Sequence, residues 1–179
     1  EYGTGPERLF RSFDRAPFAA ASIGQVHRAE LTDGTPVAVK VQYPGVREAI
    51  DHDLANVGMM IKLGGLVARG LDAGTIVRDL EDGIRAELDY RREARWQQRF
   101  FEAFDGHAFV RVPRVYHELS SSTVLVQEFL RGQPVSAALE LPQGERDRLG
   151  EMIYRFCFGS IYRHGLFNGD PHPGNFLLL

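Results

Sequence analysis

The sequence contains a single cysteine, Cys157, which rules out an internal disulfide and a cysteine-based metal cluster. It also lacks an excess of positive charge: 21 basic and 24 acidic residues give a formal net charge of −3, which argues against nucleic-acid binding. No run is apolar enough for a membrane-spanning helix, because polar and charged residues interrupt the most apolar stretch, 54–71. The chain starts without a methionine or a signal-peptide pattern and stops within an apolar run, so we expect a longer protein of unknown compartment.

What the sequence does contain is the pattern of a globular α+β domain, with 44% hydrophobic and 25% charged residues. Residues 23–31 and 36–43 predict the two strands of a hairpin, and Asp33-Gly34 is a strong turn signal between them. Valines alternate with other residues in the second strand, so Lys40 is expected on the face opposite the valines.

The rest of the chain predicts helices around a small antiparallel sheet. The periodicity and the glycine and proline positions favour, in order, helices over 46–71 and 75–104, strands over 114–118 and 123–129, a helix over 144–164 and a loop over 168–175. Gly165 is expected to end the last helix. The second helix carries four arginines, Arg91, Arg92, Arg95 and Arg99, which favour a solvated face.

The candidate chemistry begins with Lys40, in the strand sequence VAVKVQ. A lysine between valines is costly unless an anionic group meets it, as ATP phosphates meet the strand lysine of protein kinases. The carboxylate expected to hold it is Glu93, which should share a helix face with Asp89 four residues earlier. Without the other motifs, the favoured alternative is that Asp89 and Glu93 are simply solvated acids on the protein surface.

Two further segments suit a nucleotide site. The small residues at 19–22 would let the backbone approach phosphate oxygens, although such a run taken alone more often reflects plain packing. Asp170 and Asn175 are five residues apart, the spacing of the kinase catalytic aspartate and its metal-binding asparagine. Oxygen ligands of this kind suit Mg²⁺. The order of lysine, glutamate and acid–amide loop predicts a protein-kinase-like fold whose groups converge on one triphosphate.

Four blocks of sequence resemble the UbiB family of atypical kinases, also called ADCK-type: AAASIGQVHRAEL (19–31), VAVKVQYPGV (37–46), ELDYRREA (87–94) and NGDPHPGNF (168–176). The resemblance extends over nearly the whole chain from about residue 6. It implies a kinase N-lobe with family-specific helices over 1–130, and the hinge exit and the start of the C-lobe over 131–179. It also implies ATP and Mg²⁺ as cofactors.

The resemblance further implies a role for each matching residue. Catalysis would rest on Asp170 and Lys40, and metal binding on Asn175. Glu87 and Asp89 match an acidic pair peculiar to the family. The expected nucleotide-binding residues are Ala19, Ala20, Ala21 and Ser22 of an alanine-rich loop, Lys40 with its partner Glu93, and the backbone of Glu128 and Leu130 at the hinge.

The function implied by this resemblance is an atypical kinase or ATPase that supports ubiquinone (coenzyme Q) biosynthesis or isoprenoid-lipid handling. Its expected partners are nucleotide and, by resemblance, membrane lipid or quinone-pathway proteins, at a bacterial inner membrane or an organelle. The family's Lys-x-Gly-Gln and Asp-Phe-Gly-type segments do not occur in the 179 residues, so we expect these residues alone to be catalytically inert. Two alternatives stay open: a small-molecule phosphotransferase of the aminoglycoside or choline kinase type, and a nucleotide-binding pseudokinase.

Overall fold

The computed structural model describes residues 3–64, 82–84 and 88–179. The chain divides into two compact units, one made of residues 1–95 and 115–128 and the other of residues 96–114 and 129–179. Helix α3 (Tyr90–Phe104) begins in the first unit and ends in the second. The division into kinase lobes at residue 130 remains a prediction.

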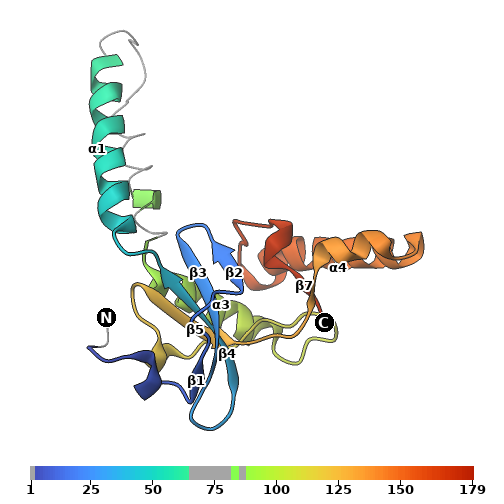
Figure 1. Ribbon diagram of the computed structural model, residues 1–179. Coiled ribbons are helices and arrows are strands. Elements are labelled where there is room, and N and C mark those ends of the chain that lie inside the picture. The colour runs from blue at the N-terminus through green and yellow to red at the C-terminus, as the bar shows by residue number, and fades with distance from the viewer. Residues whose placement is uncertain (1–2, 65–81, 85–87) are drawn as a thin grey trace. The chain divides into compact units, whose positions relative to one another are not determined.

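The first unit is built on an antiparallel sheet (Figure 1). Its strands are β1 (Ser12–Phe13), β2 (Ala19–Ala21), β3 (Gly24–Glu30), β4 (Pro36–Gln42) and β5 (Val124–Glu128). The order is β1-β3-β4-β5, and β2 pairs with the other end of β3. Together with the helices this arrangement agrees with the predicted α+β class.

The predicted hairpin is present as β3 and β4, which pair along their whole length. Gly34 at its turn has a φ of +92°, a conformation that a glycine adopts without steric cost. The Asp33 carboxylate accepts a hydrogen bond from the backbone N–H of Thr35 at 2.9 Å. The Asp-Gly signal was therefore sufficient to locate this turn.

The alanine run, which matches the family's alanine-rich loop, forms the short strand β2 and leads into a hairpin turn. Ala19, Ala20 and Ala21 pair with Val26, Gln25 and Gly24 of β3, respectively. Only Ser22 and Ile23 remain as the turn of this second, shorter hairpin. Alanine lacks glycine's freedom at positive φ, and the described residues contain no non-glycine residue with positive φ, so extended pairing suits this run.

Each face of the sheet buries its own apolar cluster. One face carries the buried valines of β4 and β5 and two further apolar residues. This cluster consists of Phe10, Ala29, Val37, Val39, Val124 and Val126. The opposite face packs against the start of α3 through Tyr90, Ala94, Val115 and Leu125. The sheet is thus covered on both faces in the first unit.

The strand predicted over 114–118 is wrong apart from one bridge, Val115 with Gln127. Residues His117–Leu119 form a 3-10 helix, η2, before β5 begins. The hydroxyl of Ser120 donates to the Tyr116 carbonyl at 2.8 Å and accepts from the Val126 N–H at 3.0 Å. These side-chain bonds take the place of ladder bonds and end the pairing.

Helices α1 and α3 differ in extent from those expected. Helix α1 runs over Val46–Gly64, and the remainder of the helix predicted to residue 71 lies outside the described residues. The predicted helix over 75–104 is not continuous, because Leu88 lies in a turn and α3 starts only at Tyr90. Most of 75–87 lies outside the described residues.

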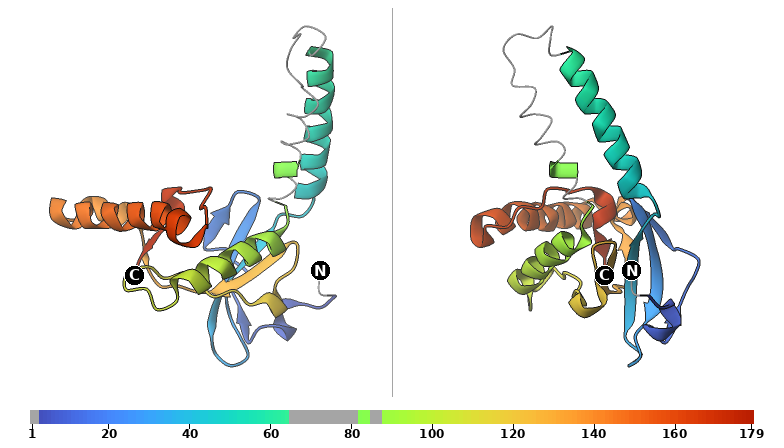
Figure 2. Two further views of the ribbon diagram at one scale, coloured as in Figure 1. Left: turned by 180° about the vertical axis from the view of Figure 1, so that it is seen from behind. Right: turned by 90° about the vertical axis from the view of Figure 1, so that its left-hand side faces the viewer.

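The second unit contains helix α4 (Gln143–His164), one uninterrupted helix in every view of Figures 1 and 2. Gly165 ends α4 with a φ of +63°, as predicted. Phe156 of α4 contacts Phe100 and Phe104 in an aromatic cluster. The second unit also contains a two-stranded sheet of β6 (Gln133–Pro134) and β7 (Leu177–Leu178), and the 3-10 helices η3 (Val135–Glu140) and η4 (Pro173–Asn175). A further 3-10 helix, η1 (Pro6–Arg8), belongs to the first unit.

Candidate functional site

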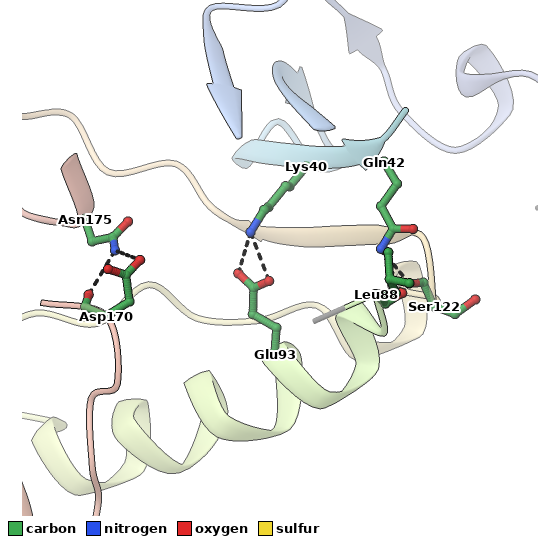
Figure 3. Close-up of polar contacts among 7 residues, drawn as sticks. All are labelled: Lys40, Gln42, Leu88, Glu93, Ser122, Asp170 and Asn175. Carbon is green, nitrogen blue, oxygen red and sulfur yellow. Dashed lines mark hydrogen bonds and ion pairs between the residues drawn. The ribbon is translucent and has the colours of Figure 1, made fainter. Parts of the chain in front are cut away.

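Lys40 lies on β4, on the face opposite the valine cluster, and forms an ion pair with Glu93 of α3. Its Nζ donates to both carboxylate oxygens of Glu93, at 2.8 and 2.9 Å (Figure 3). The side chains are 23% and 42% exposed, respectively, so solvent still reaches the pair. The pairing expected from the sequence is therefore present, and its two charges are open to a further ligand.

Glu93 lies in the first turn of α3, where the helix dipole favours a carboxylate. Asp89 lies just before the helix, and its Oδ1 accepts a hydrogen bond from the backbone N–H of Arg91 at 3.0 Å. Asp89 is thus the N-cap of α3, which corrects the expectation that it shares a helical face with Glu93. Glu87, its predicted companion in an acidic pair, lies outside the described residues.

Gln42, two residues after Lys40 on the same face of β4, attaches the start of α3 to the sheet. Its buried amide donates to the carbonyls of Leu88 and Ser122, at 2.9 and 3.4 Å (Figure 3). The backbone N–H of Tyr90 also donates to the Ser122 carbonyl, at 3.0 Å. These bonds position Glu93 one turn further along the helix. Sequence reasoning missed Gln42, although a glutamine that alternates with the valines of a strand, on the same face as Lys40, was a usable signal.

Tyr90 is a second residue that sequence reasoning missed. Its ring is 1% exposed, and the Nζ of Lys40 lies 4.7 Å from the ring centroid, within cation–π range. Burial, together with the nearby Glu93 carboxylate, raises the pKa of Tyr90 well above its ordinary value. The phenol oxygen is buried without a hydrogen-bond partner among the described residues. Lys40 is therefore held by a carboxylate and by an aromatic ring.

The predicted phosphate-contacting segment, Ala19 to Ser22, forms β2 and the tip of the β2–β3 hairpin. Gly24, on β3 just past this tip, is packed tightly against β4: a Cβ there would lie 2.2 Å from the carbonyl oxygen of Val41. Ser22 is exposed at the turn. Glu128 ends β5, paired with Val37, and Leu130 follows two residues later. The nucleotide-binding roles of these residues stay predictions.

In the second unit, the loop at 168–175 folds into a compact turn around Asp170 and Asn175. The Asn175 amide donates to the backbone carbonyl of Asp170 at 3.0 Å and to its carboxylate at 2.9 Å (Figure 3). The Nδ1 of His172 accepts from the N–H of Gly174, so this histidine caps η4. The two predicted catalytic and metal-binding residues are thus adjacent, and both are exposed.

The oxygen donors of this turn suit a hard cation such as Mg²⁺. With Asn175 donating through its nitrogen, its amide oxygen and the Asp170 carboxylate remain the ligand atoms of the right chemistry. Across residues 3–64, 82–84 and 88–179, no group of three or more His, Cys, Asp or Glu side chains is arranged to hold a metal. The residues present fit a partial, not a complete, magnesium site.

None of the helices in the described part of the chain has the length and hydropathy needed to span a bilayer.

Comparisons with known proteins agree with this geometry. The family model for the ABC1 atypical kinase-like domain matches residues 1–179. The chain is 42% identical to atypical kinase coq-8, mitochondrial, of Caenorhabditis elegans and 34% identical to atypical kinase COQ8, mitochondrial, of Saccharomyces cerevisiae, each over 177 residues. Both matches include 99% of this chain, but they include only 23% of the length of the first relative and 35% of the length of the second.

A solved structure, described as the Rv3197–erythromycin complex from Mycobacterium tuberculosis, is similar with a TM-score of 0.89 and 39% identity. The match covers 99% of this chain and 45% of that one. The predicted kinase-like α+β fold is confirmed by these likenesses, and the family resemblance suggested by the sequence motifs is confirmed as well.

Proposed function

Because the chain belongs to the ABC1 atypical kinase-like family, we propose that it supplies the nucleotide-binding residues of an atypical kinase or ATPase that uses Mg-ATP. The observation that carries the proposal is the two-oxygen ion pair between Lys40 and Glu93. A lysine fixed in this way presents its charge at a defined point on the sheet, as phosphate binding requires.

Lys40 would contact the α- and β-phosphates, while Glu93 keeps the ammonium group in place. The Tyr90 ring supports the same ammonium from the buried side, so that its position does not depend on the carboxylate alone. When ATP and Mg²⁺ are bound, they supply the transferable phosphoryl group and the positive charge that neutralises its oxygens. Each role here is assigned to a side chain whose chemistry suits it.

Asp170 would orient the attacking oxygen of water or of an acceptor, and Asn175 would contribute an amide oxygen to Mg²⁺. The mutual hydrogen bond of Asp170 and Asn175 supports this assignment, because it holds acid and amide in one turn. The tip of the β2–β3 hairpin would approach the phosphates through Ala19, Ala20, Ala21 and Ser22. The backbone of Glu128 and Leu130 would contact the adenine.

The wider role proposed for the full-length protein is support of ubiquinone biosynthesis or isoprenoid-lipid handling at a membrane. Support comes from relatives named COQ8 atypical kinases, which are described as mitochondrial. The chain spans about a quarter to a third of the length of these relatives, so this role belongs to the proposal.

Calorimetric titration of the full-length protein with Mg-ATP tests the assignment. Lys40→Ala and Glu93→Gln should each weaken binding by about tenfold or more, since each removes a charged contact. Arg11→Ala is the matched control, because it breaks another ion pair of the same unit, Arg11 with Glu30, at a solvent-exposed site. Unchanged affinity in Lys40→Ala would reject the phosphate-binding role.

A second candidate is phosphorylation of a small molecule, favoured by the solved relative whose description names erythromycin as its ligand. Mass spectrometry of erythromycin incubated with the full-length protein and Mg-ATP would detect a phosphorylated product. If the antibiotic stays unmodified while Mg-ATP binding requires Lys40, the second candidate is rejected and the first proposal is retained.

A further inference from the structure

A basic hollow lies beside the start of α3. Its arginines, Arg91 and Arg95, are four residues apart and share a face of the helix, whereas Glu93, two residues from each, does not share that face. The hollow has a volume of about 220 Å³ and is lined by Arg91, Ala94, Arg95, His117 and Ser120. Arg91, Ala94 and Arg95 lie on one stretch of α3, while the other two residues belong to η2 and to the residue after it. All five residues belong to the first unit.

The charge of this hollow is one-sided. Two guanidinium groups and an imidazole line it, and among the residues that the structure describes no Asp or Glu side chain does. Neither Arg91 nor Arg95 has an ion-pair partner among the described residues, in contrast to Lys40, Arg11, Arg15, Arg148 and Arg155. The Asp89 carboxylate caps the helix by accepting a hydrogen bond from the backbone N–H of Arg91. This bond uses part of the hydrogen-bonding capacity of the carboxylate.

The position on α3 adds to the positive potential. Arg91 and Arg95 lie within the first two turns of the helix, where the partial positive charge of the helix dipole is greatest. The Ser120 hydroxyl is already engaged with the Tyr116 carbonyl and the Val126 N–H, so it forms a fixed wall. The available donors are therefore the two guanidinium groups and the His117 ring.

We infer that this hollow binds a phosphate group, at a site separate from the one proposed for ATP. Two guanidinium groups can each present paired N–H donors to phosphate oxygens, and a tetrahedral dianion can accept from both. A volume of about 220 Å³ leaves room for the group and some of its water. A free phosphate or phosphate monoester and the exposed phosphate of an anionic lipid share this chemistry.

Occupation of the hollow would connect α3 to the segment at 117–120. Glu93 lies between Arg91 and Arg95 in sequence, so a ligand held by both arginines restrains the turn of helix that carries the Lys40 partner. Binding of phosphate should therefore also raise the thermal stability of the full-length protein, since a ligand that binds only the folded state stabilises it.

The test is calorimetric titration of the full-length protein with inorganic phosphate, and sedimentation with vesicles of phosphatidylcholine with and without phosphatidic acid. Arg91→Gln/Arg95→Gln should weaken binding of the active probe by about tenfold or more. Arg92→Gln/Arg99→Gln is the matched control, because it removes the same charge from the same helix outside the hollow.

If only Arg91→Gln/Arg95→Gln loses calorimetric binding of inorganic phosphate, the ligand is a soluble phosphate. If only that variant stops sedimenting with vesicles that contain phosphatidic acid, the ligand is a lipid phosphate. Equal losses in both double variants would show a general charge effect and overturn the inference, as would the absence of binding to either probe by the unmodified protein.

Discussion

The Lys40–Glu93 pair and the Asp170–Asn175 turn differ in how the fold builds them. The first joins residues 53 positions apart and depends on the sheet, on α3 and on buried hydrogen bonds between them. The second joins residues five positions apart through a local, exposed turn that contains Pro171 and Pro173. Substitutions around the first should therefore affect folding and binding together, whereas those in the second should leave folding nearly intact.

The largest expected effect on stability is that of Gly24→Ala. A Cβ at Gly24 would lie 2.2 Å from a backbone oxygen of β4, so the two strands must separate at the end that follows Lys40. We expect a loss of about 3 kcal/mol in the free energy of unfolding, measured by urea denaturation of the full-length protein.

Gly169→Ala is the counterpart in the Asp170–Asn175 turn. The nearest atom to a Cβ at Gly169 is 3.7 Å away, an ordinary contact, and its φ is not positive. We expect a change of less than about 0.5 kcal/mol. A loss at Gly169 as large as that at Gly24 would contradict the contrast between the two regions.

Gln42→Ala should have the next largest effect, about 1–2 kcal/mol, because it removes the buried donor to two carbonyl oxygens. Its control is Gln98→Ala, since the amide of Gln98 donates to the exposed carboxylate of Glu102 and to no other group among the described residues. Equal stability of the two variants in urea denaturation would mean that the Gln42 bonds do not attach α3 to the sheet.

Asp89→Ala should cost about 1 kcal/mol of stability, through loss of the N-cap of α3. Asp89→Ser should restore most of that loss, because a serine hydroxyl can accept the same bond. Comparison of Mg-ATP turnover by the two variants separates capping from chemistry. If Asp89→Ser is as unstable as Asp89→Ala, the capping assignment is wrong.

The smallest effect concerns Tyr90 at high pH. The raised pKa of Tyr90 keeps its phenol protonated in the folded state, whereas the unfolded chain releases that proton from about pH 10 upward. Between these two pKa values the unfolded state binds fewer protons, so stability falls as pH rises. Tyr90→Phe should show a shallower fall above about pH 10 in denaturation curves. Identical slopes would contradict the buried environment of this phenol.

The parts of the fold that could be predicted from sequence are those governed by local interactions. The Asp33–Gly34 turn, the β3–β4 hairpin and the end of α4 at Gly165 depend on residues adjacent in sequence. The start of α3 could not be predicted in the same way, because its first N–H bonds to the Ser122 carbonyl, 32 residues later. The missing strand at 114–118 has a similar cause in the bonds of Ser120.

The candidate site shows the same division. Lys40 and Glu93 were identified from motif order. The alternation of valines along β4 correctly predicted that the lysine lies on the face opposite the valines. The contributions of Gln42 and Tyr90 were missed, because both depend on how closely α3 approaches the sheet. Periodicity alone carries no information on that distance.

A double-mutant cycle on Lys40 and Glu93, with Mg-ATP affinity of the full-length protein as the readout, tests the central claim most directly. If the carboxylate acts by holding the lysine against phosphate, Lys40→Ala/Glu93→Ala should bind no more weakly than Lys40→Ala alone. Additive losses from the two substitutions would mean that the residues act independently, and the account of this pair as one phosphate-binding unit would be wrong.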